Sequence, residues 1–445
     1  MEIDQSIFRA YDVRGTYPDQ LNEDVAGKVA LAYAEKLKPK TVVVGRDLRE
    51  ASEKMEGAVK EALISRGIKV YDAGEMTNPM MGFAVFNYGY DGGIILSASH
   101  NPIGYGGLKM FSRNAVSIPG EDAEIKKFSL EDVSDYVGEP GSVEKIDIVD
   151  DYVRFLCSVI DVSGLQKKKI VFDPMFGSVN LILDRVLAGL PDEAIKIHDI
   201  ADKLFGGLSE PNPYNYQMQK DALEAVKKHK PDFGVMWDGD GDRVFFIDEN
   251  ANFIEAPYIT AILCEYILSQ KPKSKIVCDT RIIWPIEEAV KKSGGTLVES
   301  RSGYRFLKEK MTEVDAPFAA ETTAHYFFQE MKNMDNGIIP FLMVWKLLSD
   351  SDKTLSQLIA PYKKDHFMME EIKKEVADIN QVLEKVKTQY QEYESHDLDG
   401  LSILSKEFRF NLRSSNTEPV IKLNMEAKSE EILEAEKSKI LALLK

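Results

Sequence analysis

One repeated pattern limits the fold of this chain more than any other feature of its sequence. Three apolar segments each end in an aspartate before a helix-like stretch, at residues 42–47, 169–173 and 275–279. Each is followed by a second apolar run that leads into a polar loop, at residues 99–100, 238–240 and 321–323. The spacings are too uneven for a solenoid. Alternating strand and helix patterns of this kind predict three related α/β domains with mostly parallel sheets.

The C-terminal part of the chain has a different character. After Asp365, charged helical segments flank two stretches of alternating polarity, at 408–412 and 420–423. This alternation predicts an antiparallel pair in a small α+β domain. A charged segment with Gly and Pro at 138–145 and a polar one at 248–256 mark the other boundaries. We therefore expect four domains, a number that suits 445 residues, at 1–143, 144–250, 251–365 and 366–445.

Charge and cysteine content narrow the classes of partner. The net charge of −17 argues against a general binder of nucleic acid or of anionic membranes, so an anionic ligand has to meet local cations or a metal. The three cysteines are scattered without metal-ligand spacing, which fits a reducing compartment. The N-terminus lacks the basic and apolar regions of a signal peptide, and no apolar run approaches about 20 residues. These features predict a soluble, cytoplasmic protein without a membrane partner.

The first polar loop carries a candidate nucleophile. The apolar run 92–96 is typical of a buried strand, and Ser97-Ala98-Ser99-His100-Asn101-Pro102 follows it. Small residues, with glycines soon after, allow a tight loop that lifts the Ser99 hydroxyl from the sheet and lets a ligand approach the backbone. Ser99, His100 and Lys109 supply a nucleophile, a proton carrier and a cation, all of which phosphoryl chemistry can use. Taken alone, the hexapeptide is also compatible with an ordinary polar turn.

The second polar loop carries three alternate carboxylates. Asp238, Asp240 and Asp242 are separated by glycines and followed by Arg243. Such a loop can direct three carboxylates to one hard cation, as Mg²⁺ or Ca²⁺ requires. An EF-hand is excluded, because Arg243 occupies its sixth position, where Gly is required, and strand-like runs flank the loop. The adjoining arginine favours a phosphate beside a metal over a solvated acidic turn.

Two later loops offer further polar groups. Residues 413–419, Arg-Ser-Ser-Asn-Thr-Glu-Pro, are suited to holding a phosphate that is not reacting, although a β-hairpin turn explains them equally well. Residues 320–326 present acceptors and donors suited to sugar hydroxyls. His325 lies beside aromatic residues in this loop, where a structural histidine is the commoner interpretation.

With these four loops in order, the chain resembles the α-D-phosphohexomutase superfamily, and most closely its bacterial and archaeal phosphomannomutase/phosphoglucomutase branch. The resemblance covers essentially the whole length and implies three related α/β domains and a smaller C-terminal domain around a central cleft. In the family, the serine matching Ser99 is phosphorylated. The aspartates matching Asp238, Asp240 and Asp242 bind Mg²⁺ together with a phosphoserine oxygen. The resemblance thus assigns a phosphoserine to the first domain and a metal site to the second.

The resemblance also implies roles for single residues. Arg243 matches an arginine beside the reacting phosphate, and Tyr11, Arg14 and Lys109 match active-site residues of the first domain. Proton transfer falls to Lys109 or His100 on one side and to His325 or Tyr304 on the other. Glu321 and Thr323 match the pair that binds sugar hydroxyls. The remaining substrate-binding positions match Arg281 in the third domain and, in the C-terminal phosphate loop, Arg413, Ser415, Asn416 and Thr417.

The sequence departs from the family pattern mainly in the third domain. Ala320, Thr323 and Ala324 replace residues of the usual Gly-Glu-x-Ser-Gly-His loop, and the loss of two glycines is expected to stiffen it. Tyr304 follows Gly303 where a histidine is usual, and Arg281 stands where a lysine is common. These departures concern the identity of the sugar and the second acid or base more than the phosphoryl chemistry.

The activity that the resemblance implies is interconversion of hexose 1-phosphate and hexose 6-phosphate, of mannose, glucose or both. It requires Mg²⁺ and hexose 1,6-bisphosphate, which acts as both intermediate and activator. Two alternatives stay open, an amino-sugar phosphate mutase and a non-catalytic paralogue that binds sugar phosphates. The expected partners are small-molecule hexose phosphates, and we expect a monomer or a weak homodimer.

Overall fold

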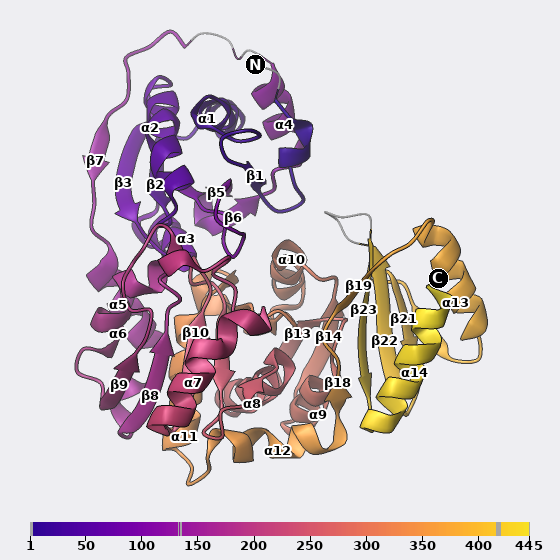
Figure 1. Ribbon diagram of the computed structural model, residues 1–445. Coiled ribbons are helices and arrows are strands. Elements are labelled where there is room, and N and C mark those ends of the chain that lie inside the picture. Colours follow the sequence, from indigo (N-terminus) through magenta and orange to yellow (C-terminus); the bar gives the residue numbers. More distant parts are fainter. Residues whose placement is uncertain (1–2, 132, 134–135, 415–419, 445) are drawn as a thin grey trace. The chain divides into compact units, whose positions relative to one another are not determined.

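The computed structural model describes residues 3–131, 133, 136–414 and 420–444 (Figure 1). The chain forms two compact units, one of residues 1–253 and 330–352 and the other of residues 254–329 and 353–445. No helix in the described part of the chain combines the length and apolar character needed to cross a membrane.

The first unit begins with a mixed sheet in the order β1-β5-β4-β2-β3-β7, with β6 paired to β5. Strand β2 is parallel to β3 and β4, whereas β5 is antiparallel to β1 and β4. The strands are β1 (Val13–Thr16), β2 (Thr41–Arg46), β3 (Lys69–Glu75), β4 (Gly92–Leu96), β5 (Tyr105–Ser112), β6 (Val116–Ile118) and β7 (Val143–Lys145). The helices are α1 (Glu23–Leu37), α2 (Glu50–Ile64), α3 (Asn78–Tyr88) and α4 (Ala123–Leu130).

Helix α1 shows why these segments fold as they do. The Asn22 side chain accepts a hydrogen bond from Val25 N at 3.1 Å and so caps the helix. Val25, Val29 and Tyr33 recur at helical spacing and are buried in one core with residues of α2 and the sheet. The apolar side of α1 therefore packs into the core of the first sheet.

The same unit holds a second sheet in the order β12-β11-β10-β8-β9. Phe341 of helix α11 packs against Phe172 and Trp237, with ring centroids 5.6 Å from each, and Trp237 Nε1 donates to Gly337 O at 2.8 Å. The strands are β8 (Lys168–Asp173), β9 (Asp192–Lys196), β10 (Phe233–Trp237), β11 (Val244–Ile247) and β12 (Phe253–Ile254). The other elements are α5 (Val149–Val159), α6 (Leu183–Leu187), α7 (Lys220–His229), β17 (Met334–Asp335) and α11 (Ile338–Ser349).

The second unit contains the third sheet, in which β14, β13, β15 and β16 adjoin in that order. Helix α8 is buried along most of its length and contacts α9 and α12. The strands are β13 (Lys275–Asp279), β14 (Thr296–Ser300), β15 (Phe318–Ala320) and β16 (Tyr326–Phe328). The helices are α8 (Ala256–Gln270), α9 (Trp284–Lys292), α10 (Tyr304–Val314) and α12 (Leu355–Asp365).

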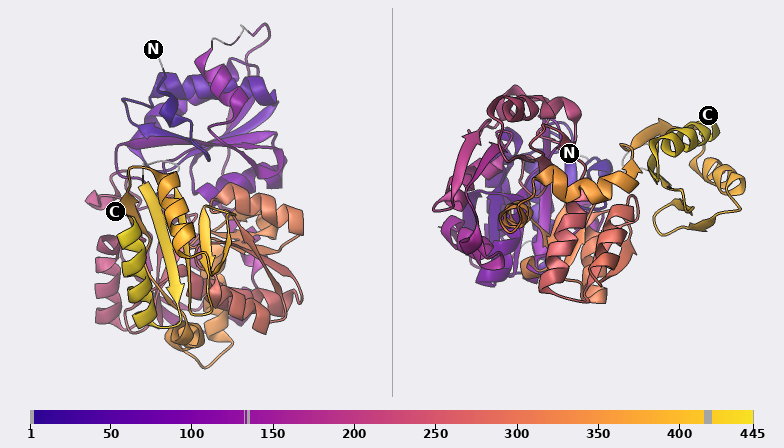
Figure 2. Two further views of the ribbon diagram at one scale, coloured as in Figure 1. Left: turned by 90° about the vertical axis from the view of Figure 1, so that its right-hand side faces the viewer. Right: turned by 90° about the horizontal axis from the view of Figure 1, so that it is seen from below.

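The fourth sheet of the protein is antiparallel throughout its recorded pairs, in the order β18-β23-β22-β21-β20 with β19 on β23. Helices α13 and α14 contact each other and share a core with the sheet (Figure 2). The strands are β18 (Phe367–Met368), β19 (Ile372–Glu375), β20 (Glu394–His396), β21 (Leu401–Leu404), β22 (Phe408–Ser414) and β23 (Val420–Ala427). The helices are α13 (Ile379–Gln389) and α14 (Glu430–Leu443). The predicted antiparallel pair is confirmed as β22 and β23.

Three sheets repeat one arrangement, which confirms the predicted three related α/β domains. Their strand orders contain β3-β2-β4-β5, β9-β8-β10-β11 and β14-β13-β15-β16. In each case the first three strands are parallel and the fourth is antiparallel. The polar loop that the sequence singled out connects the third and fourth strands every time, so the three loops occupy equivalent positions.

Segment 138–145, expected to mark a domain boundary, belongs in part to the first sheet, because β7 pairs with β3 in parallel. The exact domain limits given above remain a prediction.

Candidate active site

Ser99 lies in a tightly held loop directly after strand β4. Its side chain is 5% exposed and its φ is +50°, a left-handed conformation that a non-glycine residue adopts only where its surroundings hold it there. Ser99 N donates to Ser97 Oγ at 2.9 Å. Arg49 donates to the carbonyl oxygens of Ser99, Asn101 and Pro102 at 2.6, 2.5 and 2.9 Å. The loop is therefore fixed by its own serine and by one buried arginine.

The Ser99 hydroxyl faces the second polar loop. Its Oγ lies 3.4 Å from Asp238 Oδ2 and 3.2 Å from His100 Nδ1. A methyl group at Gly239 would lie 2.9 Å from Ser99 O, so this position needs a glycine for the two loops to approach. Gly241 has a φ of +73°, which glycine adopts without strain. The two glycines thus let the aspartate loop turn against the serine loop.

Asp238, Asp240 and Asp242 converge at this point. Their side chains are at most 2% exposed, and one carboxylate oxygen from each lies within 4.8 Å of the others. Ser97 Oγ donates to Asp240 Oδ2 at 3.0 Å, and Asn78 Nδ2 donates to Asp242 Oδ2 at 2.9 Å. Strands flank the loop, as the apolar runs predicted, and these strands, β10 and β11, are antiparallel.

Two cations balance the carboxylates. Lys109 Nζ donates to Asp240 Oδ2 at 2.7 Å and to Asp242 Oδ2 at 3.0 Å. Burial disfavours the ammonium, but these two carboxylates outweigh it and raise the pKa of Lys109, so Lys109 is a cation in this arrangement. Arg243 Nε donates to Asp238 Oδ2 at 2.9 Å, and within the described part of the chain its buried Nη2 has no hydrogen-bond partner. That nitrogen is available to an anionic ligand.

The first strand adds two more of the predicted residues. Arg14 lies on β1, donates from Nη1 to Asn101 Oδ1 at 2.8 Å and forms an ion pair with Asp12. Asn101 follows His100 directly, so Arg14 contacts the Ser99 loop. Tyr11 is half-buried and lies just before β1. The structure thus links Ser99, His100, Lys109, Arg14 and the aspartate loop within the first unit.

In the second unit, Arg281 and Glu321 lie together beside strand β13. Arg281 donates from Nε to Asp279 Oδ1 at 2.9 Å and from Nη2 to Asp279 Oδ2 at 3.0 Å and Glu321 Oε1 at 2.9 Å. Although burial opposes the charge, these carboxylates raise the pKa of Arg281. Gly303 N also donates to Glu321 Oε1 at 3.1 Å. This contact brings the residue before Tyr304 to the same carboxylate.

The loop 321–325 closes on itself around a residue in a left-handed conformation. Glu321 N donates to His325 O at 2.9 Å, and Ala324 N donates to Glu321 O at 3.0 Å. Ala324 has a φ of +68° and is buried. Thr323 and His325 are half-buried in this turn. The alanine that departs from the family pattern therefore stands where glycine would be unstrained.

Arg413 lies at the end of β22 and is held by a carboxylate that the sequence did not single out. Its Nη2 donates to Glu371 Oε2 at 3.2 Å, and Lys422 Nζ lies 3.0 Å from Glu371 Oε1. Although burial opposes ionisation, Arg281, Lys422 and Arg413 lower the pKa of Glu371 to about 2. Ser415, Asn416 and Thr417 lie outside the described residues.

The chain matches a known family along nearly its whole length. Residues 5–133, 150–251 and 256–364 match the descriptions "Phosphoglucomutase/phosphomannomutase, alpha/beta/alpha domain I", "domain II" and "domain III". Residues 367–443 match the C-terminal domain of the same group. The chain belongs to the phosphoglucomutase/phosphomannomutase family. The predicted resemblance and four-domain fold are thereby confirmed.

Other members of the family are similar over their full length. A phosphomannomutase of Escherichia coli is 36% identical, with 98% of this chain and 99% of that protein covered. A phosphomannomutase of Salmonella typhimurium is 38% identical, with 98% of each covered. A protein of Xanthomonas campestris described as phosphohexose mutases is 35% identical, with 96% of each covered.

Solved structures share the fold. A phosphoglucomutase/phosphomannomutase family protein of Burkholderia thailandensis has a TM-score of 0.90 at 26% identity, covering 99% of this chain and 97% of the other. An Aspergillus fumigatus N-acetylphosphoglucosamine mutase in complex with GlcNAc-6P and magnesium has a TM-score of 0.64 at 15% identity, covering 99% and 95%. The second likeness concerns the fold alone.

The aspartate loop of this family member fits a metal ion. Oxygen ligands suit a hard divalent cation such as Mg²⁺. Asp240 Oδ1 is buried and, among the described residues, has no hydrogen-bond partner, as expected of an oxygen that is a ligand to a cation. The converging carboxylates and this oxygen together form an acidic cluster that could bind a metal.

Several residues that shape the site were not predicted from the sequence. Arg49 holds the Ser99 loop, Asp279 orients Arg281, and Glu371 holds Arg413. One signal was present in the sequence, because Asp173 and Asp279 are the last residues of β8 and β13 and Asp47 directly follows β2. In all three, Oδ1 accepts the backbone N–H two residues later, at 2.9–3.0 Å.

Proposed function

We propose that this chain is a phosphohexomutase that interconverts hexose 1-phosphate and hexose 6-phosphate, of mannose, glucose or both, through a phosphorylated Ser99. The observation that carries the proposal is the Ser99 hydroxyl, 3.4 Å from Asp238 in a buried cluster of three carboxylates, Lys109 and Arg243. The phosphomannomutases that are similar along the full chain support the same activity.

In the first half of the reaction, phospho-Ser99 transfers its phosphoryl group to the free hydroxyl of a hexose monophosphate. The bond between phosphorus and Ser99 Oγ breaks and a bond to the sugar oxygen forms. The proton of the sugar hydroxyl passes to a base, and Ser99 Oγ takes up a proton to become the free hydroxyl. The product is a hexose 1,6-bisphosphate. In the second half the other phosphoryl group returns to Ser99, which leaves the isomeric monophosphate. Hexose 1,6-bisphosphate also activates unphosphorylated enzyme.

Charge neutralisation is the main contribution that we assign to the first unit. Asp238, Asp240 and Asp242 would hold Mg²⁺ together with a phosphoserine oxygen, and the ion would neutralise charge on the transferring phosphoryl group. Arg243 contributes its free Nη2 to the same oxygens. Lys109 is held as a cation by Asp240 and Asp242, so we favour His100, 3.2 Å from Ser99 Oγ, as the proton carrier on this side.

We assign the sugar and the non-reacting phosphate to residues of the second unit. Glu321 and Thr323 bind sugar hydroxyls, and Arg281, Tyr304 and Arg413 bind the substrate with Ser415, Asn416 and Thr417 of the phosphate loop. His325 or Tyr304 is the second acid or base. Cytoplasmic location and a monomeric or weakly dimeric state remain predictions from the sequence.

The test is a coupled assay that follows conversion of mannose 1-phosphate and glucose 1-phosphate to the 6-phosphates. It contains Mg²⁺ and a trace of glucose 1,6-bisphosphate, and compares wild type with Ser99→Ala. Turnover of either sugar that vanishes in Ser99→Ala is the expected result. Ser65→Ala is the matched control, because the Ser65 hydroxyl donates to Ala62 O at the end of its own helix. Substantial mutase activity in Ser99→Ala would refute the phosphoserine mechanism.

The metal assignment has its own test. Asp240→Asn removes one of three carboxylate charges, so we expect the Mg²⁺ concentration for half-maximal activity to rise at least tenfold. Asp221→Asn, at a side chain that is 57% exposed, serves as the control. An Mg²⁺ titration unchanged by Asp240→Asn contradicts the three-aspartate site. If neither hexose 1-phosphate reacts, N-acetylglucosamine phosphate is the next substrate to assay.

A further inference from the structure

A cavity of about 260 Å³ lies beside Arg413 in the second unit. Polar and charged residues dominate its lining: Arg301, Asp397, Leu398, Asp399, Gly400, Arg413 and Ser414. A water molecule takes about 30 Å³ of liquid volume, so a phosphate group fits this space. Arg301 is contributed by the segment after β14, whereas the other residues come from the C-terminal sheet and its turn between β20 and β21.

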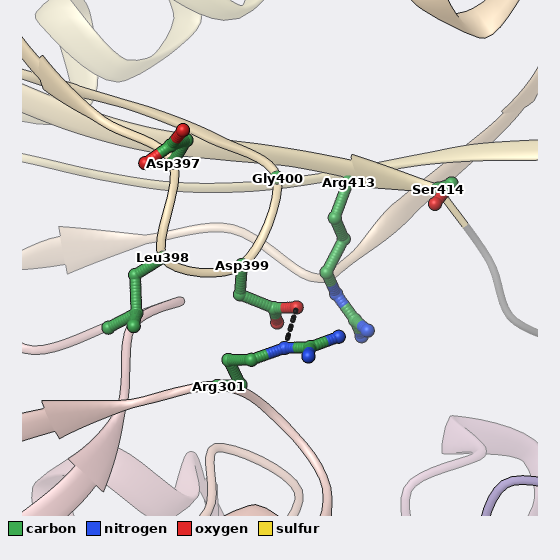
Figure 3. A pocket seen from close by; sticks show the side chains of 7 residues that line it. All are labelled: Arg301, Asp397, Leu398, Asp399, Gly400, Arg413 and Ser414. Carbon is green, nitrogen blue, oxygen red and sulfur yellow. Dashed lines mark ion pairs between the residues drawn. The ribbon is translucent and has the colours of Figure 1, made fainter.

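Two guanidinium groups face each other across this cavity. Figure 3 shows the ends of the Arg301 and Arg413 side chains turned toward one another. Arg413 is paired with Glu371 and Arg301 lies near Asp399, so each cation is partly compensated, and an anion between the two guanidinium groups adds an attraction to both. Planar guanidinium forks donate pairs of parallel hydrogen bonds to phosphate oxygens. The pair is therefore suited to a dianionic phosphate.

Neighbouring groups hold Arg301 without exhausting its donors. Its Nε lies 4.0 Å from Asp399 Oδ1, and its guanidinium lies 4.2 Å from the Phe306 ring centroid. Asp399 Oδ2 in turn accepts a hydrogen bond from Ser302 N at 3.1 Å. The Asp399 carboxylate lies at the distance limit for an ion pair with Arg301, whose side chain is 51% exposed. Arg301 is oriented toward the cavity, but its Nη groups are not claimed by a close carboxylate within the described residues.

The turn that carries Asp399 is fitted closely against Arg413. Gly400 has a φ of +75°, and a methyl group there would lie 2.8 Å from Arg413 Cα. Only glycine permits this approach without strain. The same turn therefore orients Arg301 through Asp399 and packs against the backbone of Arg413.

We infer that Arg301 is a second arginine of the subsite for the non-reacting phosphate, and that it binds the phosphate dianion of a sugar monophosphate opposite Arg413. Asp399 acts as its positioning residue. This inference rests on the proposed mutase function and deepens it. The residue comes from the third α/β domain, so the subsite is assembled from two domains of the second unit.

Steady-state kinetics of Arg301→Gln test the inference. We expect the KM for glucose 1-phosphate and for mannose 1-phosphate to rise about tenfold, with kcat changing less than threefold. The inhibition constant for inorganic phosphate should rise by a similar factor. Arg301→Lys, which keeps the charge but loses the fork, should fall between wild type and Arg301→Gln.

Arg305→Gln is the matched control, because this substitution removes the same charge four residues away. The Nε of Arg305 is paired with Glu309 at 2.7 Å. An unchanged KM in Arg301→Gln, or an equal rise of the KM in Arg305→Gln, overturns the inference. In both cases an active wild type leaves the proposed function intact. An inactive wild type instead refutes the proposed function. A raised phosphate inhibition constant with an unchanged KM assigns the cavity to free phosphate and overturns its role in substrate binding.

Discussion

The first and third α/β domains place an arginine at equivalent positions and use it differently. Arg49 and Arg281 both stand two residues after the aspartate at the end of the first strand of the repeat, since Asp47 directly follows β2 and Asp279 is the last residue of β13. Arg49 donates to the carbonyl oxygens of Ser99, Asn101 and Pro102. Arg281 donates to the carboxylates of Asp279 and Glu321. Each arginine thus contacts the polar loop of its own domain.

This difference means that the Ser99 loop is held in place, whereas the Glu321 loop can exchange its polar partners. Buried backbone carbonyls need a hydrogen-bond donor, so Arg49 keeps the Ser99 loop in one conformation. A carboxylate and an arginine can each exchange a partner for a substrate hydroxyl or phosphate. In the second domain Met175 stands at the equivalent position, and Arg243 from the loop itself holds Asp238. One repeated strand arrangement therefore carries three polar loops that are held by different contacts.

The largest expected effect comes from giving the first domain the residue of the second. Arg49→Met removes the donors of three carbonyls, and each buried unsatisfied group costs about 1–3 kcal/mol. We expect kcat to fall at least 100-fold because Ser99 is no longer held opposite Asp238. Stopped-flow measurement of the first turnover, with circular dichroism to verify folding, checks this prediction.

Arg113→Met controls for loss of charge, since Arg113 is 68% exposed. A folded Arg49→Met variant whose kcat stays within threefold of wild type would contradict the role of Arg49 in fixing the Ser99 loop. Arg49→Lys should recover part of the activity, because an ammonium can still donate to some of the carbonyls.

A medium effect concerns helix α9, which follows Arg281 and receives its N-terminal cap from the C-terminal sheet. Ile283 N and Trp284 N donate to the buried Glu426 at 2.9 and 3.0 Å. Burial raises the pKa of Glu426 from 4.5 to about 7. A folded-state pKa above the unfolded one means that its stabilisation is present at low pH and is lost as the pH rises through 7.

We therefore expect Glu426→Gln to gain stability relative to wild type between pH 5.5 and 8, by about 2 kcal/mol, since one pKa unit corresponds to about 1.4 kcal/mol. Calorimetric unfolding of both proteins at the two pH values measures the difference. Glu434→Gln, at a side chain that is 56% exposed, should show no such trend. A pH-independent difference between Glu426→Gln and wild type would contradict the cause we assign.

The smallest expected effect is a change in stability at Ala324, in the turn of the third polar loop. All three polar loops contain a residue with positive φ: Ser99 at +50°, Gly241 at +73° and Ala324 at +68°. Ala324→Gly removes a left-handed penalty of about 1–2 kcal/mol and adds the entropy cost of glycine. We expect a net gain of about 0.5–1 kcal/mol in urea unfolding. Ala320→Gly is the contrasting variant, because Ala320 lies in strand β15 and glycine there should only destabilise. A loss in both variants alike would show that the left-handed backbone at 324 is not strained.

The sequence predicted the repeated α/β unit because its signals are local. Apolar runs, the aspartates that end them and the glycines of the loops all lie within a few residues of the feature they specify. The same locality explains why 97–102 and 238–243 were recognised as candidate loops. Each loop follows a buried strand, and that position can be derived without knowing any distant contact.

The residues that were missed act over long separations. Arg49 contacts Ser99 across 50 positions, Arg281 contacts Glu321 across 40, and Arg413 contacts Glu371 across 42. No local pattern connects such pairs, and an isolated arginine or glutamate resembles any surface charge. The folded sheets bring these pairs together, because each sheet sets strands from distant parts of the chain side by side.

Phosphopeptide mapping of the protein after incubation with glucose 1,6-bisphosphate tests the central claim most directly. We expect one phosphoryl group on Ser99, which disappears when excess glucose 6-phosphate is added and appears in newly formed bisphosphate. A phosphoryl group on another residue, or sustained mutase turnover without any phosphorylated Ser99, would contradict it.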